Sequence, residues 1–386
     1  MEFRLNDEER ALRAKVRAFV EGFSLADLEA IEQEIAELES DRQAPTTFNP
    51  RLAGLGVVGM GWPGSLVPPA TQGERFVAHE ELDSAGLPTY GLEQSEAVGW
   101  MLATFGPEEL AAEHLPRILD QSWSYAGGYS EPEAGSDLLA LTSRATRTDA
   151  GWRVRGQKLW TSGAHVADWI FTLVRTDPES TRHHGLSILM IDAHAPGVTV
   201  QPVRVMGGWR VNACFFDDVE VPASHLIGEE GKAWMMMSAA LDIERSMSFG
   251  GREARLLLAR YLDRLGRTGA TLPEASWTEL GEQVAELEVE RLLGLSTVAR
   301  GEANEPASGE ASMNKIVGPA VAQRVAQLLV DRLGADALLA PGVTADRLAA
   351  DAEHFLRAAT VLSIIGGTSE VQRSIIAQRA LGLPRG

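Results

Sequence analysis

Small residues, turn formers and hydroxyl groups are concentrated in residues 128–137, which read Gly-Tyr-Ser-Glu-Pro-Glu-Ala-Gly-Ser-Asp. This composition is typical of a loop that presents backbone N–H donors to a flat or anionic ligand. A second segment, residues 157–164, reads Gln-Lys-Leu-Trp-Thr-Ser-Gly-Ala. Taken alone, its tryptophan would be assigned to a domain core, because large aromatic side chains are usually buried. The two segments therefore need to be interpreted together.

Together they resemble the flavin-binding pair of the acyl-CoA dehydrogenase family, which implies FAD as the cofactor. In that family the first loop meets the pyrimidine end and the pyrophosphate of FAD, and the tryptophan covers the flavin ring. The segment 366–373, Gly-Gly-Thr-Ser-Glu-Val-Gln-Arg, is similar to the family's C-terminal motif. The residues that the resemblance assigns to the cofactor are Tyr129, Ser130, Gly135, Ser136, Trp160, Ser162, Thr368 and Glu370.

The reaction implied by the resemblance is α,β-desaturation of an acyl thioester. It needs a carboxylate to remove the α proton while the β hydrogen leaves as hydride. Many members place this glutamate directly before the Gly-Thr of the C-terminal motif, where this chain has Gly366. A subset resembling isovaleryl-CoA dehydrogenase places it in a Leu-Asp-x-Glu-Arg segment, and residues 241–245 read Leu-Asp-Ile-Glu-Arg. We expect Glu244 to be the base, while Gly366 can still offer a backbone N–H to the thioester oxygen.

The substrate is expected to be an acyl-CoA, with Arg245, Asp242 and Ser136 ordering the site or receiving the CoA portion. Without the motif, Glu244 and Arg245 would be interpreted as solvated helix charges, since these residue types are usually exposed. The formal net charge of −19 disfavours an acidic carrier protein as the thioester donor. Chain length and branching of the acyl group are left open.

Composition indicates an ordinary globular protein of 386 residues, 45% hydrophobic, with two or three domains. The acidic charge disfavours nucleic-acid and membrane partners. The N-terminal residues lack the pattern of a signal peptide, and no apolar run is long enough to span a bilayer, so a cytoplasmic location is expected.

Three other features are assigned structural roles. Cys214 lies in an apolar run and is expected to be a buried thiol rather than a nucleophile. The pair His183-His184 has no further ligand at metal-binding spacing, so we expect a surface turn and no metal. Met235-Met236-Met237 is expected to fill core, with an acyl-pocket lining as the alternative.

Helical periodicity occupies both ends of the chain, and short β-rich runs occupy the middle. The predicted class is α+β, with an N-terminal helical domain (1–122), a middle antiparallel β domain (123–228) and a C-terminal four-helix bundle (229–386). This order is that of the acyl-CoA dehydrogenase fold. The predicted bundle helices are Trp234 to Leu265, Trp277 to Ala299, Ala311 to Leu333 and Ala345 to Ala380.

Two family motifs through which a neighbouring subunit holds FAD, Arg-x-x-Phe-Gly and Gln-x-x-Gly-Gly-x-Gly, are broken here. The corresponding segments are 262–269 and 327–334, and Asp331 would place a negative charge beside the phosphates. We therefore expect either a homodimer or homotetramer, or a heteromer with a related subunit. Electrons are expected to pass to an electron-transfer flavoprotein or similar acceptor. The alternatives are a flavin oxidase or monooxygenase on the same fold, and a non-catalytic subunit of a heteromeric dehydrogenase.

Overall fold

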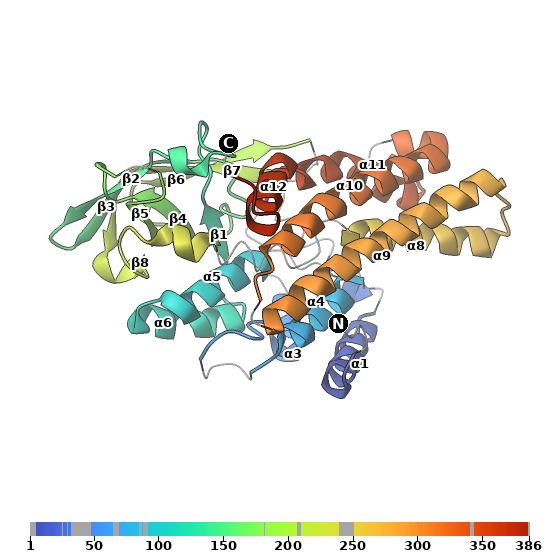
Figure 1. Ribbon diagram of the computed structural model, residues 1–386, viewed down its shortest axis with the longest axis horizontal. Coiled ribbons are helices and arrows are strands. Elements are labelled where there is room, and N and C mark those ends of the chain that lie inside the picture. The colour runs from blue at the N-terminus through green and yellow to red at the C-terminus, as the bar shows by residue number, and fades with distance from the viewer. Residues whose placement is uncertain are drawn as a thin grey trace.

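The structure is a computed structural model that describes residues 5–24, 26–28, 30–31, 48–64, 69–84, 87, 92–180, 182–206, 210–238, 251–303, 305–339 and 343–384. Helices form the lower and right-hand parts of the molecule in Figure 1, and the strands gather at the other end. No helix in these ranges is both long and apolar enough to cross a membrane.

The N-terminal part is helical, as predicted. Asn6 begins the first helix with a capping box, in which its side chain accepts from the Glu9 N–H and Glu9 reciprocates. One apolar cluster joins the first three of these helices, and a second joins the last two to the sheet. The helices are α1 (Asp7–Glu21), α3 (Phe48–Leu55), α4 (Gln72–Ser84), α5 (Leu92–Phe105) and α6 (Glu108–Leu119).

The middle part is one sheet with the strand order β6-β7-β3-β2-β4-β5-β8, and β1 pairs with β4 outside that path. Its strands are β1 (Tyr125–Gly128), β2 (Arg144–Thr148), β3 (Gly151–Lys158), β4 (Trp169–Arg175), β5 (Leu186–Asp192), β6 (Val198–Arg204), β7 (Arg210–Pro222) and β8 (Leu226–Ile227). Most pairings are antiparallel, as predicted. The expectation of a wholly antiparallel sheet was wrong in one respect, because β1 and β2 both pair with β4 in parallel. A hairpin would force β1 to run antiparallel to the strand joined to it. Because β1 follows α6 instead, it is free to pair in parallel.

The C-terminal part is a bundle of long helices around an apolar cluster that includes Leu257, Leu287, Val325 and Phe355. Its helices are α8 (Gly251–Thr268), α9 (Glu274–Glu302), α10 (Ser308–Leu333), α11 (Arg347–Leu362) and α12 (Ser369–Ile375). A continuous helix from 345 to 380 was wrong: the chain breaks at 363–368, where Gly366 and Gly367 have φ of 62° and 93°. Left-handed backbone ends a helix, and glycine adopts it without steric cost. The first predicted bundle helix is helical on both sides of 239–250, which lie outside the described residues.

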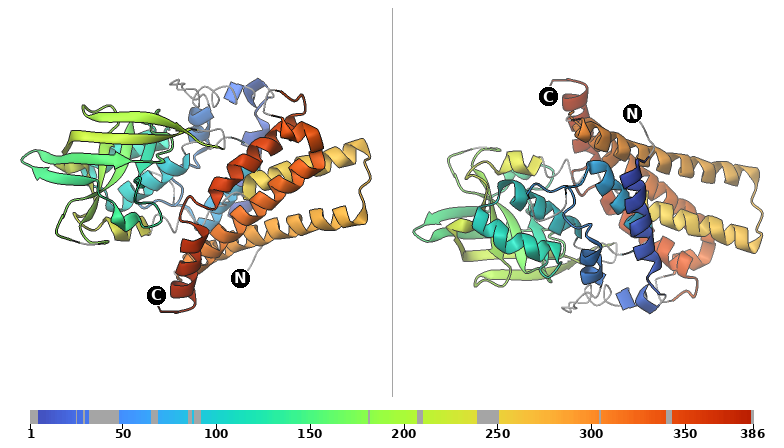
Figure 2. Two further views of the ribbon diagram at one scale, coloured as in Figure 1. Left: turned by 90° about the horizontal axis from the view of Figure 1, so that it is seen from above. Right: turned by 90° about the horizontal axis from the view of Figure 1, so that it is seen from below.

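The three parts lie in contact, and the two views of Figure 2 show α5 and α6 against the sheet with the bundle extending away from it. Buried residues of both parts, such as Met101 and Phe171, share one apolar cluster. The Gly228 N–H also donates to the Phe105 carbonyl over 3.0 Å, tying the end of β8 to the end of α5.

A buried carboxylate holds α4 and α5 together. Glu96 on α5 is 2% exposed, and its Oε2 accepts from Arg75 Nη2 over 2.6 Å and lies 3.4 Å from His79 Nε2. Burial by itself would raise the pKa of Glu96, but the charges of Arg75 and His79 and their hydrogen bonds lower it to about 2. The folded state therefore favours the ionised form.

We expect acid to destabilise the fold through Glu96. Its folded pKa lies below the usual value, so its contribution is present above about pH 4.3 and is lost as pH falls towards 2, by about 3 kcal/mol. Urea unfolding of Glu96→Gln should show a lower free energy of unfolding at neutral pH and a shallower acid dependence than the parent. Glu113→Gln, an exposed change on α6, is the control. An unchanged acid slope in Glu96→Gln would contradict this assignment.

Candidate functional site

The two loops singled out from the sequence lie side by side. The first follows β1 and the second follows β3. The Leu159 N–H donates to the Ser130 carbonyl over 2.9 Å, which joins them directly. A tight turn within the first loop is closed by paired backbone hydrogen bonds between Glu131 and Ala134. Residues from positions 129–137 and 159–164 therefore share one surface.

A buried ion pair ties the two loops more firmly than this backbone contact. Lys158 is the last residue of β3 and is fully buried; its Nζ lies 2.8 Å from Glu131 Oε1 and donates to the Tyr129 carbonyl over 3.1 Å. Glu131 also accepts from the Thr142 N–H, the Thr142 hydroxyl and the Ser143 N–H at 2.7, 2.8 and 2.9 Å. The carboxylate is thus bonded on both oxygens.

Burial shifts the pKa of both partners of this pair. It would raise the pKa of Glu131, but the Lys158 charge and the hydrogen bonds from Lys158, Ser143 and Thr142 lower that pKa to about 2. Burial lowers the pKa of the Lys158 ammonium to about 8, although Glu131 opposes the shift. A buried charge without its partner is strongly destabilising, so neither residue can be removed alone without loss.

Trp160 projects from the second loop. Its side chain is 55% exposed, and its backbone has φ of 66°, a left-handed value that costs a non-glycine residue about 1–2 kcal/mol. The next residue anchors this turn, because Thr161 and Asn212 exchange both backbone hydrogen bonds and Asn212 Nδ2 donates to the Thr161 carbonyl over 2.9 Å. A large aromatic ring held outward at a cost in strain is suited to cover a flat ligand.

The other loop residues assigned from the sequence lie in the same region but differ in how exposed they are to solvent. Tyr129 and Ser130 are half-buried, whereas Gly135, Ser136 and Ser162 are exposed. A Cβ placed on Gly135 would meet no atom within 4 Å, so the backbone there is open to approach. Half-buried residues near the sheet and open backbone farther out fit a ligand with a flat ring and an anionic tail, which are the features of FAD.

The C-terminal assignments lie at the break between α11 and α12. The buried Gln372 donates through Nε2 to the carbonyls of Gly366 and Gly367, over 3.0 and 3.2 Å. Thr368 is the N-cap of α12 and accepts from the Val371 N–H over 3.3 Å. Glu370 is exposed, and its pKa is lowered by hydrogen bonds with its own backbone N–H and with Thr368. Gly366 thus lies in a fixed turn.

Asp242, Glu244 and Arg245 lie outside the described residues, so their expected roles stay predictions. The buried thiol and the surface turn are confirmed, whereas the prediction that Met235 fills core was wrong. Cys214 is buried, and burial raises the pKa of its thiol to about 11, which suits no nucleophile at neutral pH. His183 and His184 lie in an exposed turn, and no group of metal-ligating side chains occurs among the residues placed in the structure. Met236 and Met237 fill core, but Met235 is exposed.

Sequence reasoning gave no role to the residues that hold this site together, Glu131, Lys158 and Asn212. Glu131 and Lys158 both lie within the quoted motif segments, and opposite charges in two segments that must meet are a usable signal of a pair. Asn212 lies on β7, far along the chain, and nothing in its local sequence indicates that it faces Thr161.

Three family models match the chain in sequence order. They are described as the acyl-CoA dehydrogenase N-terminal domain (residues 6–122), middle domain (126–219) and C-terminal domain (231–381).

The chain is also similar to individual acyl-CoA dehydrogenases. The chain is 34% identical over 354 residues to acyl-CoA dehydrogenase IpdE1 of Mycobacterium tuberculosis (strain ATCC 25618 / H37Rv), which covers 88% of each protein. A solved structure described as the Tcur3481-Tcur3483 steroid ACAD superposes with a TM-score of 0.88 at 31% identity, over 100% of both chains. The ChsE4-ChsE5 complex from Mycobacterium tuberculosis has a chain with a TM-score of 0.85 at 28% identity, also over 100% of both chains.

Lys158→Met is expected to weaken FAD binding by about tenfold or more, because it leaves the Glu131 carboxylate buried without a cation and loosens both loops. The double variant Lys158→Met/Glu131→Gln removes the unpaired charge and should recover part of the loss. Titration of the apoprotein with FAD, followed by flavin fluorescence, measures the dissociation constants.

The control is Arg153→Met on the same strand, because its pair with Glu220 is exposed and exposed pairs contribute little. Equal FAD affinity in Lys158→Met and the parent would show that the buried pair does not position the loops.

Proposed function

Because the chain belongs to the acyl-CoA dehydrogenase family, and is therefore an FAD-dependent oxidoreductase acting on acyl-CoA, we propose how its own residues divide that reaction. The observation that carries the proposal is the joined pair of loops, fixed by Lys158 and Glu131, with an exposed Trp160 beside them. Bound FAD supplies the acceptor for the hydride that leaves the substrate's β carbon.

We propose that the loops and the C-terminal turn hold this cofactor. Half-buried Tyr129 and Ser130 would meet the pyrimidine edge, the open backbone at Gly135 and Ser136 would meet the pyrophosphate, and Trp160 with Ser162 would cover the ring. Thr368 and Glu370 at the start of α12 would complete the site.

Glu244 is proposed to remove the α proton of the thioester. Gly366 cannot do so, since it has no side chain, and its left-handed backbone also disfavours a glutamate at that position. The backbone of the 366–368 turn, held by Gln372, would instead orient donors toward the thioester oxygen as negative charge develops on it. Proton removal and oxyanion stabilisation would thus come from different segments.

The CoA portion is proposed to bind through Arg245, with Asp242 and Ser136 ordering that end of the site. CoA carries several negative charges and the chain is acidic overall, so specific cations must receive it. The similar Tcur3481-Tcur3483 structure is described as a steroid ACAD. We propose that the substrate of this chain likewise carries its acyl group on a bulky ring system.

Glu244→Gln is expected to abolish flavin reduction by acyl-CoA, slowing it by about 10³-fold or more, because the amide cannot accept the proton. Loss of the flavin absorbance on anaerobic mixing with a ring-bearing propanoyl-CoA measures the step. FAD content should be unchanged. Reduction by Glu244→Gln at the parent rate would contradict the assignment, and rapid reoxidation of reduced parent enzyme by air would favour an oxidase over transfer to an electron-transfer flavoprotein.

We also propose that a related but different subunit completes the FAD site. Two neighbours, Tcur3481-Tcur3483 and ChsE4-ChsE5, are each named as a pair of proteins. In this chain the segments 262–269 and 327–334 are helical up to Thr268 and Leu333, and their polar side chains pair internally. Arg264 pairs with Asp346, Arg267 with Asp263, and Gln327 donates to Asp331 over 2.9 Å. Each of these side chains already has a partner within its own subunit.

The chain purified alone is expected to contain well under one FAD per chain, and co-expression with the complementary subunit should raise occupancy to one FAD per pair. Absorbance of the bound flavin, together with mass by light scattering, gives both quantities. Asp331→Gly should raise the flavin content of the isolated chain, because it removes a carboxylate from the expected phosphate face. A homo-oligomer with full flavin occupancy would contradict the partner proposal.

A further inference from the structure

A small cavity of about 250 Å³ lies on the sheet, and arginines and threonines make up most of its lining. It is formed by β2, β3 and β7, and Figure 1 shows β2 and β3 at the end of the molecule remote from the bundle. None of the residues assigned to FAD, to the base or to CoA lines it. Its volume is below the roughly 300–1,000 Å³ of sites for drug-sized molecules, so it suits a smaller ligand.

The strand register brings three arginines onto one face of the sheet. Arg144 on β2 lies directly opposite Arg155 on β3, and Arg153 is two residues from Arg155 on the same strand. The intervening residues Ala145 and Val154 are buried, so the alternation of side chains turns the arginines to the solvent side. Like charges directly opposite each other destabilise a sheet. An anion placed between them would remove that cost.

A carboxylate on the neighbouring strand holds one of these arginines. Asp218 on β7 pairs with Arg155, at a point where the pairing of β3 with β7 shifts register. Its backbone has φ of 53°, a strained value for a residue with a side chain, and bulges of this kind re-aim side chains. The hydrogen bond from Arg155, and then the charges of Arg155, Arg153 and Arg144, lower the pKa of Asp218. One carboxylate thus orients Arg155 among three guanidinium groups.

The other arginines differ in how far they are already engaged. Arg153 Nε lies 2.7 Å from Glu220 Oε1, and Arg147 Nη2 lies 3.1 Å from Glu230 Oε2. Arg144 lines the cavity but makes no hydrogen bond or ion pair with the residues that the structure describes. Its guanidinium is available to a ligand without the loss of an existing contact.

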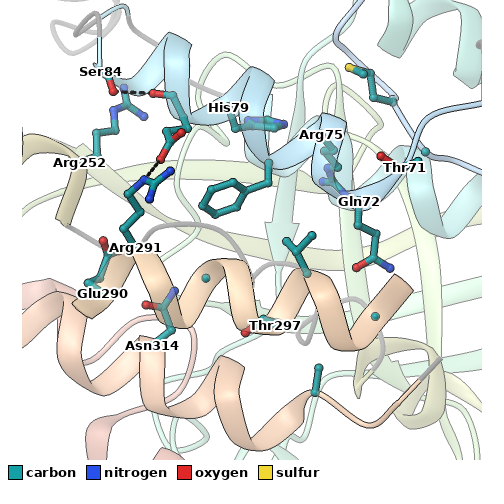
Figure 3. A pocket seen from close by; sticks show the side chains of 18 of the residues that line it. Thr71, Gln72, Arg75, His79, Ser84, Arg252, Glu290, Arg291, Thr297 and Asn314 are labelled. Carbon is teal, nitrogen blue, oxygen red and sulfur yellow. Dashed lines mark hydrogen bonds and ion pairs between the residues drawn. The ribbon is translucent and has the colours of Figure 1, made fainter. Parts of the chain in front are cut away.

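A second cavity shows the more usual arrangement. Figure 3 shows this space of about 500 Å³, with α4 on one side and α9 and α10 on the other. There Arg255 lies 3.1 Å from Glu290, and Arg291 pairs with Glu80. A charged ligand would have to break such pairs, whereas at Arg144 it would not.

Threonine hydroxyl groups add donors to the smaller cavity. Thr146 and Thr148 both line it, and Thr148 Oγ1 is shielded from solvent and has no hydrogen-bond partner. Buried polar atoms are nearly always bonded, so this hydroxyl marks a place where a ligand can complete the bonding.

The acidic charge of the whole chain does not prevent an anion from binding here. The formal net charge is −19, but residues 144–155 contain four arginines and only one carboxylate, Asp149. At physiological ionic strength, charges separated by more than about 8 Å are largely screened from each other. The groups close to the cavity therefore decide which ligand it attracts.

We propose that Arg144, Arg153 and Arg155 form a binding site for a small ligand that carries a diphosphate group. An arginine offers a phosphate two parallel N–H donors, and two arginines directly opposite each other match two linked phosphates. The site is separate from that of FAD, and the inference does not depend on the proposed desaturation.

The test is a ³¹P NMR titration with inorganic pyrophosphate at low ionic strength. It uses the FAD-loaded protein, with its partner subunit if FAD requires one, so that the cofactor's own diphosphate site is filled. The parent should bind with a Kd of about 1 mM or tighter. Arg144→Gln should weaken binding by about tenfold or more, since it removes a charge-assisted contact. Its Tm should not fall, because the change also removes a like-charged pair.

Two further variants complete the test. The double variant Arg155→Gln/Asp218→Asn removes the second guanidinium together with its carboxylate and should also weaken binding about tenfold. Arg10→Gln on α1 removes the same charge from an exposed position outside the cavity and should bind as the parent does.

No binding to the parent at about 10 mM pyrophosphate, or equal affinity in the parent and Arg144→Gln, would overturn the proposal. Displacement of pyrophosphate by coenzyme A would also overturn it, since the two would then share one site. Tighter binding of a hexaglutamate peptide than of pyrophosphate would exclude a diphosphate site and favour an acidic protein partner. Pyrophosphate binding that is lost in Arg144→Gln, kept in Arg10→Gln and unaffected by coenzyme A supports it.

Discussion

The buried contact between Lys158 and Glu131 is the interaction on which the candidate site depends. It joins the end of β3 to the loop after β1, and these two segments carry most of the residues assigned to FAD. Each charge is removed from water and is stable there only because the other is present. The exposed surface of the site is therefore organised by a contact that is itself buried.

The order of helices, strands and helices was predictable because periodicity and capping are local properties, as the capping box at Asn6 shows. The family motifs singled out two loops, and the structure places these loops side by side. The parallel pairing of β1 and the break at Gly366 were missed, since each depends on where a distant segment lies or on a backbone angle that composition does not encode. Asn212 was missed for the same reason: its significance comes from the neighbour that the fold brings to it.

Charged side chains are arranged differently in two regions of the protein. Around the loops, a single buried pair fixes the geometry and leaves an open surface where an anionic cofactor can lie. Around a cavity lined by residues of α4, α8, α9 and α10, the arginines are engaged by carboxylates or a backbone carbonyl, and the lining is mainly apolar. A single protein can thus present one surface suited to phosphates and another with an apolar lining, although its net charge is strongly negative.

The two left-handed glycines between α11 and α12 also constrain how this protein can change during evolution. A glutamate arising at position 366 would meet a backbone angle that costs a side chain about 1 kcal/mol or more, in a turn whose carbonyls are already bound by buried Gln372. Restoring a carboxylate there would add backbone strain of the kind that Trp160 also carries. A chain with this turn therefore favours a base placed elsewhere.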